Sequence, residues 1–144
     1  MSTSAETRVT DLLFVYGTLM QGFQNGFARH LHANATLVGP ASFQGYLYRI
    51  TYFPGAVYDA NAPGRVHGEV WQLHNPGDIL QKLDHYEGVL PDGSGLYVRR
   101  EVSAQLASGS ELLVDTFLYN RPLDKATLIE SGRFNVHHNT SSQW

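Results

Sequence analysis

Short strand-like segments separated by glycine and proline turns constrain the fold of this sequence more than any other feature. Runs rich in β-branched and aromatic residues predict strands over 12–16, 43–48, 55–58, 66–73, 97–106 and 111–119. The last two strands are joined through Ser108-Gly109-Ser110, which predicts a hairpin. So many short strands favour a sheet that curls or closes on itself, because closure hides the strand edges.

Two helices are predicted between these strands. Residues Phe27–Asn34 carry apolar side chains at helical spacing. Asn75-Pro76-Gly77-Asp78 supplies capping groups for a second helix, whose apolar residues recur at spacings of three and four until Gly88 ends it. A further helical turn is expected within Asp124–Ile129. Many strands with a few short helices predict an α+β domain.

The length of 144 residues favours one domain over residues 1–144. The chain is 42% hydrophobic and 16% charged, so it has enough apolar material for a core and too little charge for disorder. Segments 1–10 and 135–144 are mostly small or polar, and we expect them to be flexible tails.

The charge balance and the absence of cysteine exclude several classes of partner and site. Ten Lys and Arg residues against thirteen Asp and Glu residues, with no run of like charge, favour neither a nucleic acid nor a membrane partner. A chain without cysteine has no disulfide scaffold or thiolate, and it suits a reducing cytoplasm. The apolar run from Leu12 ends at Gly17, too early for a spanning helix or a signal peptide. The oligomeric state stays open.

Neither metal chemistry nor serine chemistry is predicted. The clusters His30-x-His32 and His137-His138 have no carboxylate at a recognised ligand spacing. Gly93-Ser94-Gly95 lies in a turn-rich loop and lacks the strand, elbow and helix that a catalytic serine requires. We therefore expect no metal and no cofactor.

The segment Tyr16-Gly17-Thr18-Leu19 directly follows the first predicted strand. A glycine there lets the backbone turn sharply, so that consecutive N–H groups form a small nest for a carboxylate. A turn that merely leaves the sheet explains the same residues equally well.

Glu87 is the sharper candidate, because helical spacing directs its side chain with the apolar face. Burial and the negative end of the helix dipole both raise the pKa of a carboxyl in that position, which suits proton transfer near neutral pH. The alternatives are a frayed, exposed helix end or a structural ion pair with Arg99 or Arg100. Asp84 and Lys82 point to either side of the apolar face of this helix, and we expect them to be solvated surface charges.

Three motifs together resemble the gamma-glutamylcyclotransferase-like superfamily, especially its gamma-glutamylamine cyclotransferase and AIG2-like members. The motifs are Phe14-Val15-Tyr16-Gly17-Thr18-Leu19, Leu83-Asp84-His85-Tyr86-Glu87-Gly88, and Tyr97-Val98-Arg99 followed by Val102. Gly68-Glu69-Val70-Trp71 and Asp115-Thr116-Phe117-Leu118-Tyr119 are also similar, so the resemblance runs from Leu12 to about Phe134.

This resemblance implies a small mixed β-barrel with packed short helices, and a cofactor-independent enzyme of acyl-transfer or lyase type. It implies that a γ-glutamyl amine or γ-glutamyl amino acid is converted to 5-oxoproline and a free amine. Glu87 stands at the family's catalytic position; Tyr16, Gly17, Thr18 and Leu19 stand at the substrate loop. Tyr119 matches a tyrosine often found near that cavity.

The sequence departs from the family pattern at two places. Ser131-Gly132-Arg133-Phe134 lacks the acidic residue and the tryptophan often found after the glycine, and the loop Pro91–Leu96 is longer and glycine-rich. Leaving-group specificity is expected to depend on such loops. Two other functions stay open: a non-catalytic protein of the same fold that binds a small ligand, and a pathway enzyme that removes a γ-glutamyl protecting group.

Overall fold

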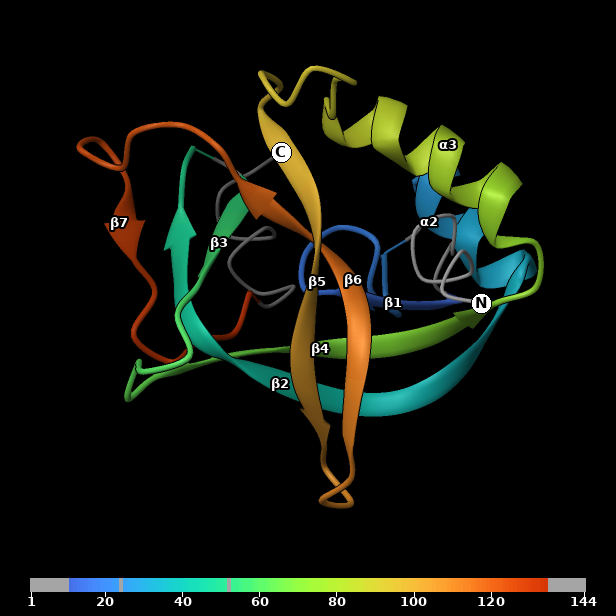
Figure 1. Cartoon of the computed structure of the whole chain (residues 1–144), viewed down its shortest axis with the longest axis horizontal. Coiled ribbons are helices and arrows are strands. Elements are labelled where there is room, and N and C mark those ends of the chain that lie inside the picture. The colour runs from blue at the N-terminus through green and yellow to red at the C-terminus, as the bar shows by residue number, and fades with distance from the viewer. Residues whose placement is uncertain (1–10, 24, 52, 135–144) are drawn as a thin grey trace, which may run out of the picture.

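The computed structural model describes residues 11–134 except residues 24 and 52. Its elements, labelled in Figure 1, are β1 (Leu12–Val15), α2 (Gly26–Ala33), β2 (Ala35–Arg49), β3 (Pro54–Tyr58), β4 (Arg65–Leu73), α3 (Pro76–Glu87), β5 (Tyr97–Leu106), β6 (Glu111–Tyr119) and β7 (Thr127–Leu128). The predicted tails and the pair His137-His138 lie outside the described residues.

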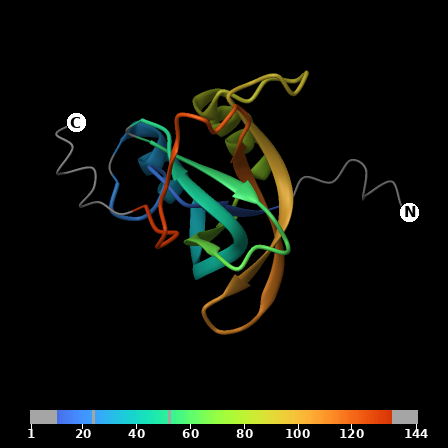
Figure 2. The ribbon, with the colours of Figure 1, turned by 90° about the vertical axis from the view of Figure 1, so that its left-hand side faces the viewer.

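Five of these strands close into a mixed barrel. The strands follow the order β2-β4-β1-β6-β5, and β5 pairs with β2 again through Ala41 opposite Leu106 and Ser42 opposite Gln105. The pair β1–β6 is parallel, and the other pairs are antiparallel. Helices α2 and α3 lie together at one side of the barrel, and both views show the β5–β6 hairpin projecting away from α3 (Figures 1 and 2). The predicted α+β class and small mixed barrel are confirmed.

Strand β2 is much longer than the predicted strand 43–48. It spans Ala35–Arg49, pairing with β4 over its first two thirds and with β3 at its end. Gly39 and Pro40 resemble a turn in the sequence, but here the ladder with β4 continues through both of them, after a bulge between Leu37 and Gly39 that shifts its register. Pro40 lacks an N–H, and its carbonyl accepts a hydrogen bond from the N–H of Ala107 at 3.0 Å.

The helical turn predicted within Asp124–Ile129 is wrong. Thr127 and Leu128 form the short strand β7, which pairs antiparallel with Arg49 and Tyr48 of β2. Just beyond it, the N–H of Ile129 donates to the carbonyl of Leu47 at 2.8 Å. The free edge at the end of β2 supplies hydrogen-bonding partners that no local pattern reveals.

Two apolar clusters lie on the two sides of β1, because successive side chains of a strand point to opposite faces. Leu13 and Val15 belong to the cluster beneath α2 and α3. Phe14 and Tyr16 belong to the cluster inside the barrel. The end of β1 therefore lies where the barrel interior and the helical layer meet.

The start of α2 and the end of α3 help to position the site, whereas Asn75 makes no side-chain capping bond at the start of α3, where the sequence predicted capping groups. The Asn25 side chain caps α2, its Oδ1 accepting the N–H of Ala28 at 2.8 Å. Helix α3 ends at Glu87, and Gly88 follows with φ of 75°, which confirms the predicted stop. Neither helix of the described part has the length and apolar character needed to cross a membrane.

Candidate active site

A cavity of about 280 Å³ lies between the end of β1, the end of α3 and the start of β5. Glu87 carries the only charged side chain among the described residues that line it. The lining residues are Phe14, Val15, Tyr16, Gly17, Thr18, Leu19, Phe53, Pro54, Tyr86, Glu87, Leu96, Tyr97 and Phe117. The cavity therefore combines an apolar wall, a glycine-containing loop and one carboxyl group.

The Glu87 side chain is partly buried at the last position of α3. The pKa of the Glu87 carboxyl is raised to about 7, mainly by burial and to a lesser extent by the negative charge of Asp84. Arg99 binds Asp84 and Asp115, and Arg100 donates to the backbone oxygen of Arg99, so neither arginine takes Glu87 as its partner. The two other interpretations of Glu87, an exposed helix end and a structural ion pair with Arg99 or Arg100, are therefore wrong.

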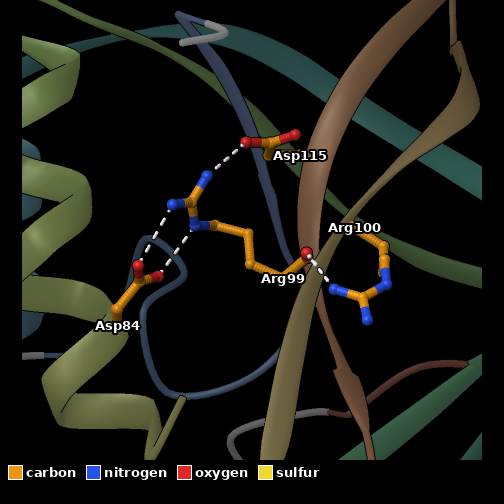
Figure 3. Close-up of polar contacts among 4 residues, drawn as sticks. All are labelled: Asp84, Arg99, Arg100 and Asp115. Carbon is orange, nitrogen blue, oxygen red and sulfur yellow. Dashed lines mark hydrogen bonds and ion pairs between the residues drawn. The ribbon is translucent and has the colours of Figure 1, made fainter. Parts of the chain in front are cut away.

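Asp84 is not the solvated surface charge that helical spacing predicted. The Arg99 guanidinium binds it with two nitrogens, Nε to Oδ1 at 2.8 Å and Nη2 to Oδ2 at 3.1 Å. The prediction is wrong because β5 lies beside α3 and brings an arginine to this flank of the helix, as Figure 3 shows. Lys82 is exposed as predicted and pairs with Asp78 at 3.8 Å.

The loop after β1 is held from outside the cavity. The carbonyl of Thr18 accepts a hydrogen bond from the Asn25 side chain at 2.9 Å, and the carbonyl of Leu19 lies 2.8 Å from Nε2 of His32. Gly17 does not have a positive φ, so its backbone conformation does not require glycine. The requirement is steric: a Cβ at position 17 would lie 2.9 Å from Cγ of Pro54. The absence of a side chain lets the loop approach the start of β3.

The N–H groups of this loop are available to a ligand. Within the described residues, none of the N–H groups of Gly17, Thr18 and Leu19 donates a hydrogen bond. The C=O and N–H groups of a trans peptide point in opposite directions, so the Leu19 N–H points away from Asn25. The loop therefore offers backbone donors next to the Glu87 carboxyl.

Tyr16 uses its hydroxyl to join strands. The hydroxyl donates to the carbonyl of Phe117 at 2.5 Å and accepts the N–H of Ala56 at 3.2 Å. Burial and the negative charge of Glu87 raise the pKa of Tyr16 far above its ordinary value, so the phenol stays neutral. Tyr16 thus contributes its ring to the cavity and its hydroxyl to the packing of β1 on β3 and β6.

Tyr86 and Tyr97 line the cavity, and sequence reasoning missed both. The Tyr86 hydroxyl lies 3.0 Å from Oγ1 of Thr18, and the Tyr97 hydroxyl donates to the carbonyl of Pro54 at 2.5 Å. Each stands in one of the motifs that carry the resemblance, so their place in those motifs was a usable signal.

Tyr119 is not among the residues that line the cavity. Its ring packs edge-on against Tyr97, with the two centroids 5.7 Å apart, and its Cβ would lie 2.7 Å from a Cβ at Gly55. The structure thus brings Tyr16, Gly17, Thr18 and Leu19 to Glu87 and leaves Tyr119 behind Tyr97.

The motif His30-x-His32 does not gather metal ligands. The His32 ring stacks on Trp71, with centroids 4.5 Å apart, while its Nε2 meets the carbonyl of Leu19. Over the described residues, no group of three or more histidine or carboxylate side chains is placed to hold a metal ion. His32 thus supports the loop after β1.

A family model described as "Gamma-glutamyl cyclotransferase, AIG2-like" matches residues 13–136. The chain belongs to this family. Proteins named gamma-glutamylcyclotransferase family protein YtfP are similar to it. The Citrobacter rodentium protein is 37% identical over 123 residues, covering 85% of this chain and 93% of the relative. The Escherichia coli K12 protein is 37% identical over 121 residues, covering 83% and 92%.

Solved structures agree with this assignment. The solution structure of Escherichia coli YtfP is 34% identical and has a TM-score of 0.62, covering 88% of this chain and 97% of that one. An AIG2-like protein from Mus musculus has a TM-score of 0.65 at 21% identity, covering 87% and 88%, and shows the shared fold.

The two departures from the family pattern have clear structural settings. Gly132 has a φ of 71°, and a Cβ there would lie 1.9 Å from the carbonyl oxygen of Arg65, so only glycine fits. Phe134 is buried and stacks on Phe23, with ring centroids 6.2 Å apart. In the loop Pro91–Leu96, the N–H of Leu96 donates to Gly88 at 2.9 Å and ties the loop to the end of α3.

Proposed function

We propose that this family member is an active γ-glutamyl cyclotransferase with Glu87 as its general acid and base. It converts a γ-glutamyl amine or γ-glutamyl amino acid to 5-oxoproline and a free amine. The observation that carries the proposal is that one cavity holds both a carboxyl of raised pKa and backbone N–H groups with no acceptor in the described part of the chain. Family membership supports the same reaction class.

The proton transfers follow from the chemistry of the substrate. An α-ammonium group is not a nucleophile, so the Glu87 carboxylate first accepts one of its protons. The amine nitrogen then attacks the γ-carbonyl carbon and closes a five-membered ring. The protonated Glu87 gives its proton to the departing nitrogen, and the old C–N bond breaks. The ring nitrogen's surplus proton passes through the regenerated carboxylate to the released amine.

A pKa of about 7 suits Glu87 to both steps, because a base and acid works best when its pKa lies near the working pH. An ordinary glutamate is too weak a base for an ammonium group and too rarely protonated near neutral pH to donate. Burial thus supplies the property that the reaction needs.

The loop Tyr16–Leu19 is proposed to fold the substrate for attack. Nucleophile and electrophile belong to one molecule, so holding the γ-glutamyl chain bent removes most of the entropic barrier. The N–H groups of Gly17, Thr18 and Leu19, which have no acceptor among the described residues, suit the α-carboxylate or the oxyanion of the tetrahedral intermediate. Tyr119 would act only through Tyr97, against which it packs.

The test is mass-spectrometric detection of 5-oxoproline across γ-glutamyl amines, γ-glutamyl dipeptides and glutathione. We expect turnover by the wild type and at least a 10³-fold loss in Glu87→Gln, which keeps the shape but accepts no proton. The matched control is Glu111→Gln, an exposed position at the start of β6, which should keep full activity. Binding of γ-glutamyl compounds without any 5-oxoproline would instead indicate a non-catalytic binding protein.

A further inference from the structure

Three charged residues outside the cavity join α3 to the barrel. Arg99 of β5 binds Asp84 of α3 with two nitrogens, while its Nη1 donates to Oδ2 of Asp115 on β6 at 2.7 Å (Figure 3). We propose that Arg99 is a positioning residue for Glu87, holding the last turn of α3 so that the carboxyl stays aimed into the cavity. The inference rests on the proposed function, because it takes Glu87 as the reacting group.

Asp84 is the right residue to hold, because it lies three positions before Glu87 on the same side of the helix. Its main chain also closes the helix: the carbonyl of Asp84 accepts the N–H of Val89 at 2.8 Å, across the left-handed Gly88. One residue thus receives both the arginine and the hydrogen bond that ends the helix. Displacing Asp84 displaces the turn that carries Glu87.

The contact differs from an ordinary surface ion pair. The side chains of Arg99, Asp84 and Asp115 are only 28%, 24% and 13% exposed. All three guanidinium nitrogens of Arg99 donate hydrogen bonds to these carboxylates. Because the guanidinium is planar, these bonds fix the orientation of the Asp84 carboxylate as well as its distance from Arg99. All three residues also fall within segments that resemble the family, yet the proposed proton transfers use none of them.

Arg99 also affects the charge next to Glu87, through Asp84. The charge of Asp84 disfavours the Glu87 carboxylate, and the bound guanidinium offsets part of that charge. The raised pKa values of Tyr16, Tyr86 and Tyr97 keep those phenols neutral. The described groups that interact electrostatically with Glu87 are Asp84 and Tyr86 of α3, Tyr16 after β1 and Tyr97 of β5. Arg99 binds Asp84, and Asp115 of β6 binds Arg99. Because the tyrosines are neutral, the charge that acts on the Glu87 carboxyl comes from Asp84 and from the residues bound to it.

Two substitutions separate positioning from simple stabilisation. Arg99→Gln leaves Asp84 uncompensated, so the protonation midpoint of Glu87 should rise, by up to about one pH unit. Asp84→Asn removes the negative charge and keeps the guanidinium on Asp115, so the midpoint should fall. A merely structural role would weaken the fold in both variants and would not shift the midpoint in opposite directions.

Turnover should show the loss of position. We expect kcat of Arg99→Gln to fall roughly tenfold or more, with a smaller change in KM, because small displacements of a reacting group are costly. Arg99→Lys should recover part of kcat, since one ammonium keeps the charge without the fork. The matched control is Arg100→Gln. The Arg100 side chain is exposed and, among the described residues, donates to the Arg99 carbonyl, so this variant should stay within about twofold of wild type.

The experiment measures 5-oxoproline formation against pH and, separately, titrates the ¹³C-labelled Glu87 carboxyl by NMR, assigned with Glu87→Gln. Opposite midpoint shifts support the inference even if the wild type forms no 5-oxoproline, in which case only the proposed function fails. Midpoints that stay fixed or move together in Arg99→Gln and Asp84→Asn overturn it, whether or not the enzyme turns over. If Arg99→Gln does not fold, Arg99→Lys replaces it, and an unchanged kcat and midpoint in that variant overturns the inference.

Discussion

Replacing Glu87 with glutamine should stabilise the protein in alkaline solution and have little effect in acid. The folded state raises the pKa of this carboxyl from 4.5 to about 7. Between those two values the folded protein keeps a proton that the unfolded chain has lost, so wild-type stability falls as the pH rises through this window. Below about pH 4.5 both states are protonated and the group contributes nothing.

The magnitude follows from the size of the shift. Each pKa unit corresponds to about 1.4 kcal/mol, so the ionised carboxylate costs the folded state up to about 3 kcal/mol above pH 7. This is an upper limit, because the side chain is only partly buried and water in the cavity reduces the cost. For a domain of this size, 3 kcal/mol corresponds to roughly 10 °C in Tm.

The assay is urea and thermal unfolding of wild type and Glu87→Gln at steps from pH 4.5 to 8.5. We expect equal stability at the acid end, an advantage of the variant that grows between about pH 4.5 and pH 7, and a constant difference above that. Glu111→Gln, an exposed glutamate on β6, is the control and should show no growing advantage over this range. A variant less stable than wild type at pH 8, or a difference that does not change with pH, would refute the assignment of a carboxyl whose ionised form is destabilised by the fold.

The other predictions concern the same cavity. Gly17→Ala should lower kcat/KM at least about tenfold, because its Cβ would lie 2.9 Å from Pro54, whereas Thr18→Ser should stay within about threefold; kinetics on one substrate compares them. Tyr16→Phe should cost about 1–3 kcal/mol in urea unfolding by leaving two buried backbone groups unpaired, and a neutral result would contradict the hydroxyl's role. If Glu87 must be ionised to accept the first proton, kcat/KM should fall about tenfold per pH unit below pH 7; a flat profile down to pH 5 would exclude it as the base.

Local patterns in the sequence determined much of the fold. The predicted strands 97–106 and 111–119 match β5 and β6 to the residue, because alternating side chains and a glycine turn act within a few positions. The end of α3 at Gly88 and the inward direction of Glu87 also follow from helical spacing and from glycine's freedom in the left-handed region.

Features that depend on distant partners needed the tertiary structure. β7 forms because the end of β2 offers unpaired backbone groups, and nothing within 124–129 encodes that edge. The length of β2 through Pro40 likewise depends on pairing with β4, and the Pro40 carbonyl finds its partner in Ala107, more than sixty residues away.

The site divides in the same way. The sequence alone indicated Glu87 and the loop 16–19, since their residue types and spacing carry the chemistry and the resemblance. Closure of the barrel brought Tyr97 to the cavity and left Tyr119 behind it, although both lie on neighbouring strands. Packing of α3 beside β5 likewise converted Asp84 from an expected surface charge into the partner of Arg99. Helical periodicity specifies the direction of a side chain, whereas its partner depends on which strand the closed barrel places opposite it.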